Sequence, residues 1–427
     1  MHGIITLLPF LKILSTFILI LVCIRLKLGL WLSVLGGALS IALLFGLGAG
    51  EWLQVSVAAL GKEKFLFLVS IVGLILILSD GLERSGQSQR LMDALSGYLH
   101  DNRLRLIFFP ALIGLLPMPG GAVFSAPMVK AVSADMPIQN IDRAIINYWF
   151  RHVWELAWPL YPGIILTVAL AEIPLSAFIS KSWPGVVAMF LFGWLFLLRP
   201  ATRGKYFSEN TVDVTKERNI KRVLKEATPL LIAIVGAIGL ESILARFAHH
   251  IPFEWGVLAA LCVAAMSVMM QNNLRGDYLV HILTKKSLWS MLAVIAAIFI
   301  FKDTMQAAGV VEAMAEASGE KAALFAAAIL LPFLVGMVSG INVAFVGATF
   351  PLLLGLLEIM HLQHQSVPYL ILATFSGFTG VMISPIHICF MLTCEYFATD
   401  LVATWKKLVL PCTGFALTGI GLFFILI

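Results

Sequence analysis

Long apolar runs separated by short polar segments recur along the whole chain, as at 65–78, 186–198 and 291–301. A bilayer core about 30 Å thick requires about 20 apolar residues for one helical crossing, and many of these runs approach that length. They predict an all-α polytopic membrane protein with about ten transmembrane helices. The predicted crossings are residues 4–22, 28–48, 64–80, 144–172, 183–198, 228–245, 254–270, 287–303, 366–397 and 405–427.

Proline and glycine interrupt several of the apolar segments near their middle. Two of these are the crossings 144–172 and 366–397, which we expect to be broken helices. The segments 104–134 and 321–357 are expected to be re-entrant helix–turn–helix hairpins, which enter the membrane and return. Breaks at membrane depth leave backbone groups unpaired and are tolerated only where they are buried in protein or line a cavity. The interruptions therefore mark the predicted functional centre.

Charge is scarce, because only 12% of the 427 residues are charged and 60% are apolar, whereas soluble domains carry about a quarter charged residues. We expect no soluble domain. The net charge of +5 is attributed to basic residues in the loops of a membrane protein and not to nucleic acid binding. The expected partners are the lipid bilayer and a small-molecule anion. The five cysteines lie mostly in apolar runs without metal-ligand spacing. They predict buried free thiols, no cofactor and no firm metal site.

Lysine and arginine are distributed unevenly over the loops between the predicted crossings. When the basic loop 199–226 is placed in the cytoplasm, most other basic residues also fall on the cytoplasmic side, as the positive-inside rule requires. This orientation predicts a multi-pass protein of the cell (inner) membrane with both termini outside.

The two halves of the chain resemble each other at a nearly constant offset. The predicted units are an N-terminal span (1–26), repeat 1 (27–198), a basic loop with a linking span (199–253) and repeat 2 (254–427). An odd number of crossings relates the repeats, so the second copy is inverted, which is typical of alternating-access carriers. Corresponding positions include Asp80 and Asp303, Pro110 and Pro332, Pro162 and Pro385, and Trp183 and Trp405. We expect the two aspartates to fix the following turns through local hydrogen bonds.

The tips of the two predicted hairpins are candidates for substrate binding. A helix that starts at such a tip presents free N–H groups and its positive dipole end to the membrane interior, which favours an anion. The alternative is that the tips are kinks packed against neighbouring helices. The candidate residues are Pro119, Gly120, Gly121 and Ser125 at the first tip, and Gly340 and Asn342 at the second.

The first broken crossing contains a buried charge next to its break. Arg151 lies inside the predicted span, where an unpaired charge costs several kcal/mol, so we expect it to bind substrate together with Tyr148. Glu155 follows Arg151 by four residues on the same helix face, and an internal Arg151–Glu155 ion pair remains an equal alternative. His152 and Glu155 are candidates for carrying a coupling proton.

The second broken crossing is rich in hydroxyl groups and has no arginine. Thr379 and Ser384 are candidate substrate ligands, and Ser376 is a candidate ligand of a coupling Na⁺. His387, just beyond the break, is the second proton candidate, or a buried structural histidine. The segment 91–99 is amphipathic at helical spacing and is expected to lie in the membrane interface.

These features together predict a secondary active transporter that moves a small organic anion of the carboxylate class by alternating access, as a symporter with H⁺ or Na⁺. A cation/proton antiporter, with Glu155 as the ion ligand, is the alternative. An intramembrane hydrolase built on Ser376 and His387 is a remote alternative, so we expect no enzyme activity. The sequence contains no nucleotide-binding motif of the G-x-x-x-x-G-K-[ST] type.

Two runs carry a family resemblance: Pro-Met-Pro-Gly-Gly-Ala-Val-Phe-Ser-Ala-Pro at 117–127 and Asn-Tyr-Trp-Phe-Arg-His-Val-Trp-Glu at 147–155. They resemble the prokaryotic integral membrane family known as domain of unknown function 401. That family is similar in layout to the ion transporter superfamily, which includes carriers of di- and tricarboxylates, gluconate, lactate and arsenite. The resemblance implies a homodimer of elevator type, with a fixed scaffold and a moving domain built from both hairpins and both broken helices.

The chain departs from the sodium-coupled dicarboxylate members of that superfamily at the hairpin tips. Those members carry Ser-Asn-Thr at the tips, whereas this chain carries Pro-Gly-Gly and Gly-Ile-Asn. Neither their sodium sites nor their substrate can therefore be carried over.

Overall fold

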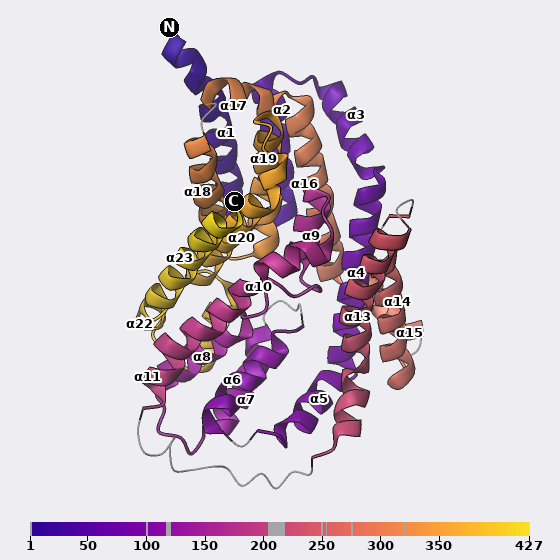
Figure 1. Cartoon of the computed structure of the whole chain (residues 1–427), viewed down its shortest axis with the longest axis vertical. Coiled ribbons are helices and arrows are strands. Elements are labelled where there is room, and N and C mark those ends of the chain that lie inside the picture. Colours follow the sequence, from indigo (N-terminus) through magenta and orange to yellow (C-terminus); the bar gives the residue numbers. More distant parts are fainter. Residues whose placement is uncertain are drawn as a thin grey trace.

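The protein is described by a computed structural model, which covers residues 2–99, 101–116, 121–203, 218–248, 251–252, 254–274, 276–318 and 321–427. Within these residues the chain is helical and contains no β-strand (Figure 1). Pro119 and Gly120 of the predicted first tip, and residues 204–217 of the predicted cytoplasmic loop, lie outside the described residues.

The first half of the chain contains α1 (His2–Arg25), α2 (Leu30–Phe45), α3 (Ala49–Leu60), α4 (Glu63–Arg84), α5 (Gln87–Ser96), α6 (Asn102–Ile113), α7 (Gly121–Val132), α8 (Asn140–Arg151), α9 (Pro162–Ala171) and α10 (Leu175–Phe192), followed by the π-helical η1 (Gly193–Leu198) and α11 (Arg199–Ala201). The second half contains α13 (Ile220–Phe247), α14 (Glu254–Gln271), α15 (Gly276–Thr284), α16 (Lys286–Ala307), α17 (Val310–Ser318), α18 (Lys321–Ser339), α19 (Asn342–Ile359), η2 (Gln363–Gln365), α20 (Ser366–Ile383), α21 (Ile388–Tyr396), α22 (Leu401–Lys406) and α23 (Val409–Leu426).

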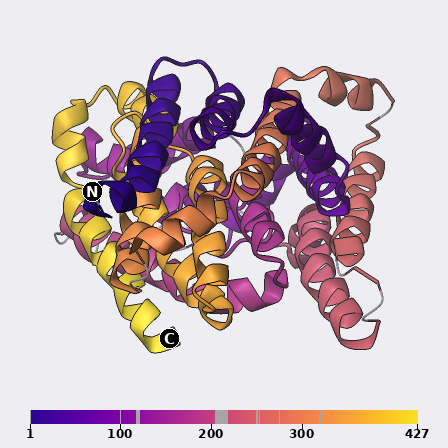
Figure 2. The ribbon, with the colours of Figure 1, turned by 90° about the horizontal axis from the view of Figure 1, so that it is seen from above.

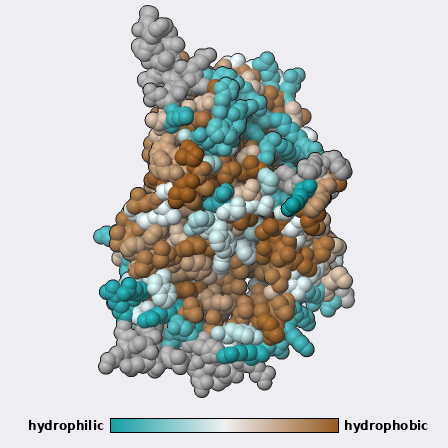
Figure 3. Space-filling model, viewed as in Figure 1, coloured by the Kyte–Doolittle hydropathy of each residue, from teal (hydrophilic) through white to brown (hydrophobic). Residues whose placement is uncertain are grey.

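By length and composition, 10 helical segments of the described chain can cross a membrane, which agrees with the predicted number of spans. Their membership differs, because α18 and α19, predicted as one hairpin, are each long enough to cross, with 19 and 18 residues. The predicted crossings 28–48 and 144–172 are not among the ten, because α2 has 16 residues and the break divides the second into α8 and α9, with 12 and 10 residues. Hydrophobic side chains form a broad band across the face in Figure 3, with hydrophilic ones towards both ends. Such a band is the surface expected of a multi-pass membrane protein.

The same succession of elements occurs in both halves of the described chain. In the first half a long helix (α4), a short helix (α5), a hairpin (α6 and α7) and a broken helix (α8 and α9) follow one another. The second half repeats this order with α16, α17, α18 and α19, and then α20 and α21. Helices α6 and α7, and α18 and α19, lie in the segments predicted as hairpins, and α8 and α9, and α20 and α21, lie in the segments predicted as broken helices. That the hairpins are re-entrant and that the halves are inverted repeats stay predictions.

Two reciprocal ion pairs join α4 and α16, the corresponding long helices. Lys62, just before α4, contacts Asp303 near the end of α16 at 2.7 Å, and Lys285, just before α16, contacts Asp80 near the end of α4. The two helices therefore run antiparallel. This pairing corrects the expectation of local hydrogen bonds, because both aspartates bind a lysine of the other half.

Helices α13, α14 and α15 form one side of the molecule, opposite α22 and α23, in both views (Figures 1 and 2). Helix α13 packs against α14, and α14 packs against α4. A polar network joins α5 to this side, because the amide of Gln87 donates to the carbonyl O of Glu226 and to Gln271 Oε1, both at 2.9 Å. The predicted amphipathic segment 91–99 overlaps α5 at residues 91–96, and its Leu91 and Met92 are buried inside the protein.

The centre of the fold is built from helices that are buried all round. Every residue of α8 from Ala144 to Arg151 is buried, as are most residues of α19 and nearly all of α20. A helix without an exposed polar face is typical of the core of a large bundle. The polar and charged groups on these central helices must therefore find partners inside the protein.

Candidate functional site

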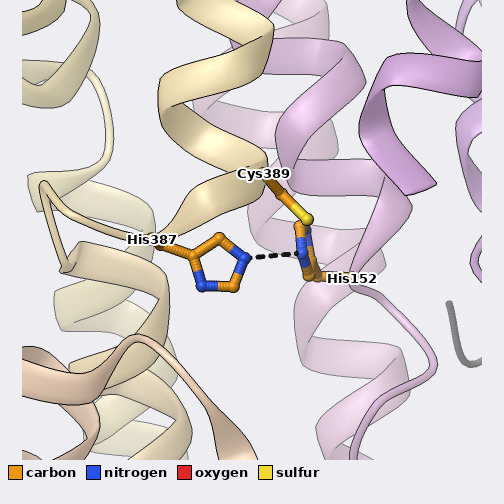
Figure 4. Close-up of side chains that lie close together, drawn as sticks. All are labelled: His152, His387 and Cys389. Carbon is orange, nitrogen blue, oxygen red and sulfur yellow. Dashed lines mark hydrogen bonds between the residues drawn. The ribbon is translucent and has the colours of Figure 1, made fainter. Parts of the chain in front are cut away.

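The two broken helices meet at their breaks. Helix α8 ends at Arg151 and α9 begins only at Pro162, while α20 ends at Ile383 and α21 begins at Ile388. Proline cannot donate to a helical ladder and fits the first helical position, which explains why α9 starts where it does. Across the two breaks, Nε2 of His152 and Nε2 of His387 lie 3.2 Å apart (Figure 4).

Each hairpin tip packs against one of the breaks through a glycine. A Cβ atom on Gly121 would lie 2.6 Å from Nε of Arg151, and one on Gly340 would lie 3.0 Å from Cα of His387. Gly340 also has a φ of +64°, which an L side chain rarely adopts. The absence of side chains at these positions thus lets the tips approach the breaks.

Arg151 joins the first break to the first hairpin. Its guanidinium donates to Tyr161 Oη at 2.9 Å and to the carbonyl O of Leu116 at 3.1 Å, and Tyr161 in turn donates to the carbonyl O of Gly114 at 2.6 Å. Only 2% of its side chain is exposed, and Glu155 Oε1 lies 3.9 Å away. Both the predicted substrate role of Arg151 and the alternative of an internal ion pair are compatible with these contacts.

Glu155 joins the first break to the second hairpin. Its Oε2 accepts a hydrogen bond from Nδ2 of Asn342 at 2.5 Å, while its Oε1 lies 3.8 Å from Nε2 of His152. The carboxylate therefore lies between an amide, an imidazole and the guanidinium of Arg151. The structure thus brings five predicted site residues together: Arg151, His152, Glu155, Asn342 and His387.

Hydrogen bonds fix the orientation of His152. Its Nδ1 donates to the carbonyl O of Tyr148 at 2.6 Å, since a carbonyl can only accept. In the neutral imidazole, Nε2 is then the acceptor and faces His387. The ring of Tyr148 packs against both imidazoles, with centroid distances of 4.8 and 5.6 Å, and its hydroxyl donates to the carbonyl O of Met382 at 2.9 Å.

Several predicted hydroxyl ligands donate to backbone carbonyls. Ser376 and Ser384 donate to Ile329 and Met337 of α18, each at 2.6 Å, and so hold α20 against the second hairpin. Thr379 and Ser125 donate within their own helices, to Phe375 at 2.7 Å and to Ala122 at 3.2 Å. Their roles as ion or substrate ligands stay predictions.

Among the described residues, Ser376 and His387 each hydrogen-bond to a different group, and no hydrogen bond joins them. Ser376 hydrogen-bonds to Ile329, whereas His387 hydrogen-bonds to His152.

Two residues of this centre are missing from the sequence prediction. Cys389 is buried beside both histidines, and the signal for it was the short spacing His-Ile-Cys at 387–389. Asn147 is fully buried on α8, and its Nδ2 donates to the carbonyl O of Ala122 on α7 at 2.9 Å. The signal for Asn147 was a polar amide one helical turn before Arg151. All five cysteines are free, and Cys389, Cys394 and Cys412 are buried as predicted. The prediction is wrong for Cys262, which is exposed, and Cys23 is only partly buried.

The sequence matches the model of the family described as "Protein of unknown function (DUF401)" over residues 8–426. The chain belongs to this family. No curated protein matches the sequence. Among solved structures, this DUF401 chain is similar to the YdaH transporter of Alcanivorax borkumensis, whose topology is described as unusual. The TM-score is 0.56 and the sequence identity 14%, and the alignment covers 89% of this chain and 88% of that chain. The family prediction is confirmed, and the YdaH likeness shows a shared fold.

Proposed function

We propose that the protein is a secondary active transporter, which moves a small organic anion of the carboxylate class by alternating access, coupled to H⁺ or Na⁺. The observation that carries the proposal is the convergence of both hairpin tips and both helix breaks on one buried cluster of charged residues. Broken helices that meet near the middle of a bundle are the usual place for the substrate in such carriers. The fold shared with the YdaH transporter supports a transport role.

The reciprocal ion pairs between α4 and α16 support an inverted duplication. Lys62 with Asp303 and Lys285 with Asp80 are equivalent pairs, as expected if a two-fold axis relates two antiparallel copies. In carriers of this kind the two repeats adopt different conformations, and an exchange of these conformations moves the site from one side of the membrane to the other.

The hairpins and breaks are tied together in a way that favours movement as one body. Arg151 bonds the first break to Leu116 of the first hairpin, and Glu155 bonds it to Asn342 of the second. His152 and His387 join the two breaks. A moving domain of elevator type, built from these elements, would carry its site without breaking the contacts inside it.

The anion is placed at Arg151 because two favourable features coincide there. Helix α7 begins at Gly121, directly against the guanidinium, so a helix N-terminus and an arginine share one position. A carboxylate bound there replaces Glu155 as the partner of Arg151. The released Glu155 is then the group that takes up a coupling proton, which links anion binding to proton binding.

A cation/proton antiporter is the second candidate, and the position of Glu155 favours it. The carboxylate is buried between Asn342 and His152 and lies 3.9 Å from Arg151. In that mechanism Glu155 binds the cation and the proton alternately, and Arg151 remains a structural counter-charge.

Transport by purified protein in liposomes separates the two candidates. Counterflow of labelled mono- and dicarboxylates is measured with and without Na⁺ and a pH gradient, and Na⁺-driven dissipation of a pH gradient is measured without carboxylates. We expect carboxylate counterflow in the wild type and its loss in Arg151→Lys, because lysine cannot bind a carboxylate with two parallel hydrogen bonds. Arg143→Lys, on the same helix and bonded to Ser133, is the matched control and is expected to transport normally.

Carboxylate counterflow that persists in both Arg151→Lys and Arg151→Met would refute the anion site at Arg151. Na⁺-driven proton movement without carboxylate flux, abolished by Glu155→Gln, would establish the antiporter instead.

A further inference from the structure

Three side chains able to bind a transition metal lie together at the junction of the two breaks. His152 follows α8, and His387 and Cys389 lie at the start of α21, and all three are buried (Figure 4). Their ligand atoms all lie within 4.8 Å of one another. We propose that His152, His387 and Cys389 bind one thiophilic metal ion of the Zn²⁺ type. This inference goes beyond the transport proposal and does not depend on it.

The distances are close to those that a tetrahedral ion requires. Metal–nitrogen bonds of about 2.0–2.1 Å and metal–sulfur bonds of about 2.3 Å place the ligand atoms about 3.3–3.7 Å from one another. The two Nε2 atoms are already 3.2 Å apart. The other separations extend to 4.8 Å, so side-chain movements of about 1 Å are needed for the cluster to close around an ion.

The hydrogen bond between His152 and Tyr148 prepares the site. Metal-bound histidines usually donate their second N–H to a carbonyl or carboxylate, which fixes the tautomer and aims the free nitrogen at the metal. His152 does this with the carbonyl O of Tyr148 at 2.6 Å. Its Nε2 is thereby directed towards His387, where the metal would lie (Figure 4).

The chemistry of binding balances within this group. Without metal, each neutral imidazole carries one proton: that of His152 is on Nδ1, and that of His387 is on Nε2, which donates to Nε2 of His152. On binding, that proton moves to Nδ1 of His387, and the thiol of Cys389 releases its proton to solvent. One thiolate and two neutral imidazoles then bind the ion, and one proton is released for each ion bound.

Glu155 lies beside the three ligands and supplies a second negative charge close to the ion. Its Oε1 lies 3.8 Å from Nε2 of His152, while its Oε2 is held by Asn342. The thiolate and the carboxylate together balance a divalent ion, which a buried site requires. The guanidinium of Arg151 keeps the carbonyl of Leu116 and the hydroxyl of Tyr161 as partners.

The ligand types identify the class of metal. Na⁺, Mg²⁺ and Ca²⁺ prefer oxygen ligands, whereas a thiolate combined with imidazoles selects Zn²⁺ and related soft or borderline ions. The ion joins the break after α8 to the break before α21. Its binding therefore stabilises the arrangement in which the two broken helices are in contact.

Metal binding is tested on the purified full-length protein in detergent. Bound Zn²⁺ is measured by mass spectrometry after equilibrium dialysis against buffered free Zn²⁺, and Co²⁺ replaces Zn²⁺ for absorption spectra. We expect one ion for each chain and a sulfur-to-cobalt charge-transfer band. Cys389→Ser is expected to abolish that band and to weaken Zn²⁺ binding more than about 100-fold, because even the outer partners of metal ligands contribute about 10–100-fold.

Cys394→Ser is the matched control, since Cys394 is also buried on α21 but lies outside the cluster, and it is expected to bind like the wild type. His387→Gln is expected to weaken Zn²⁺ binding as Cys389→Ser does, and it replaces that variant if the serine protein does not fold. No binding by the folded wild type, or an unchanged affinity and spectrum in the folded ligand variants, would overturn the proposal. Because the readout is metal binding and not transport, failure here is distinct from failure of the proposed function.

Discussion

Removal of the guanidinium of Arg151 is expected to destabilise the protein strongly, and the size of the effect follows from its partners. At 3.9 Å, unit charges attract by about 4 kcal/mol at an effective dielectric constant of about 20, and the desolvation of both groups offsets part of this. Arg151→Met also deprives the Leu116 carbonyl of its donor and leaves Glu155 as a buried charge. Removing one partner of a buried ion pair lowers the free energy of unfolding by about 3–5 kcal/mol. We expect Arg151→Met to lower it by an amount in that range.

A double-mutant cycle then measures the coupling between Arg151 and Glu155. Arg151→Met, Glu155→Gln and the double variant are unfolded in mixed micelles with increasing detergent denaturant and followed by tryptophan fluorescence. If the two groups form an ion pair, the double variant is more stable than the sum of the single losses predicts, by about 1–3 kcal/mol. Strictly additive losses would refute the ion pair and leave Glu155 to act through Asn342 and His152 alone.

Three further predictions concern the hairpin tip and two ion pairs. Gly340→Ala is expected to lower the free energy of unfolding by about 1–2 kcal/mol, because Gly340 has a φ of +64° and packs against His387. A melting temperature equal to that of the wild type would contradict this. Lys285→Ala is expected to lower the free energy of unfolding by about 1–3 kcal/mol, because it leaves the buried carboxylate of Asp80 without its lysine partner. The double variant Asp80→Lys with Lys285→Asp is expected to restore part of this loss, as measured by thermal melts. The hydrogen bond from Lys64 lowers the pKa of Glu172, so this pair stabilises the fold above the carboxyl's ordinary pKa and stops doing so as the pH falls through the lowered value. Because both groups are largely exposed, Glu172→Gln is expected to reduce the free energy of unfolding by less than about 1 kcal/mol at pH 7. A larger loss, or one that does not diminish as the pH falls through the lowered pKa, would contradict that account.

Four polar or charged side chains are buried together in the central cluster. Arg151, His152, Glu155 and His387 each have polar partners on another element, and their removal from water is costly unless these partners are in place. Contacts of this kind hold the hairpins and breaks in one arrangement. A ligand that offers alternative partners to the same groups would favour a different arrangement.

The sequence by itself determined the membrane class, the interrupted helices and the family, because each depends on local chemistry. Apolar runs of sufficient length must lie in a bilayer. Proline and glycine disfavour a continuous helix, so the breaks before Pro162 and at 384–387, and the turn at Gly340, could be predicted from neighbouring residues. Composition alone does not place a break, because Pro110 and Pro332 lie inside helices. Arg151 was identified in the same way, as a charge inside an apolar span.

Only the tertiary structure decided which of these groups meet. Asp80 and Lys285 are 205 positions apart and His152 and His387 are 235 positions apart, and periodicity carries no information about such pairs. Ser376 was predicted as a ligand of the coupling ion and Ser384 as a substrate ligand, and these roles stay predictions. That both hydroxyls donate to carbonyls of α18 depends on how α20 packs, which the sequence does not show. The same packing brings Cys389 to His152. The reason is physical: helix formation is set by local backbone chemistry, whereas a buried polar group takes whichever partner the packing of distant helices brings within hydrogen-bonding distance.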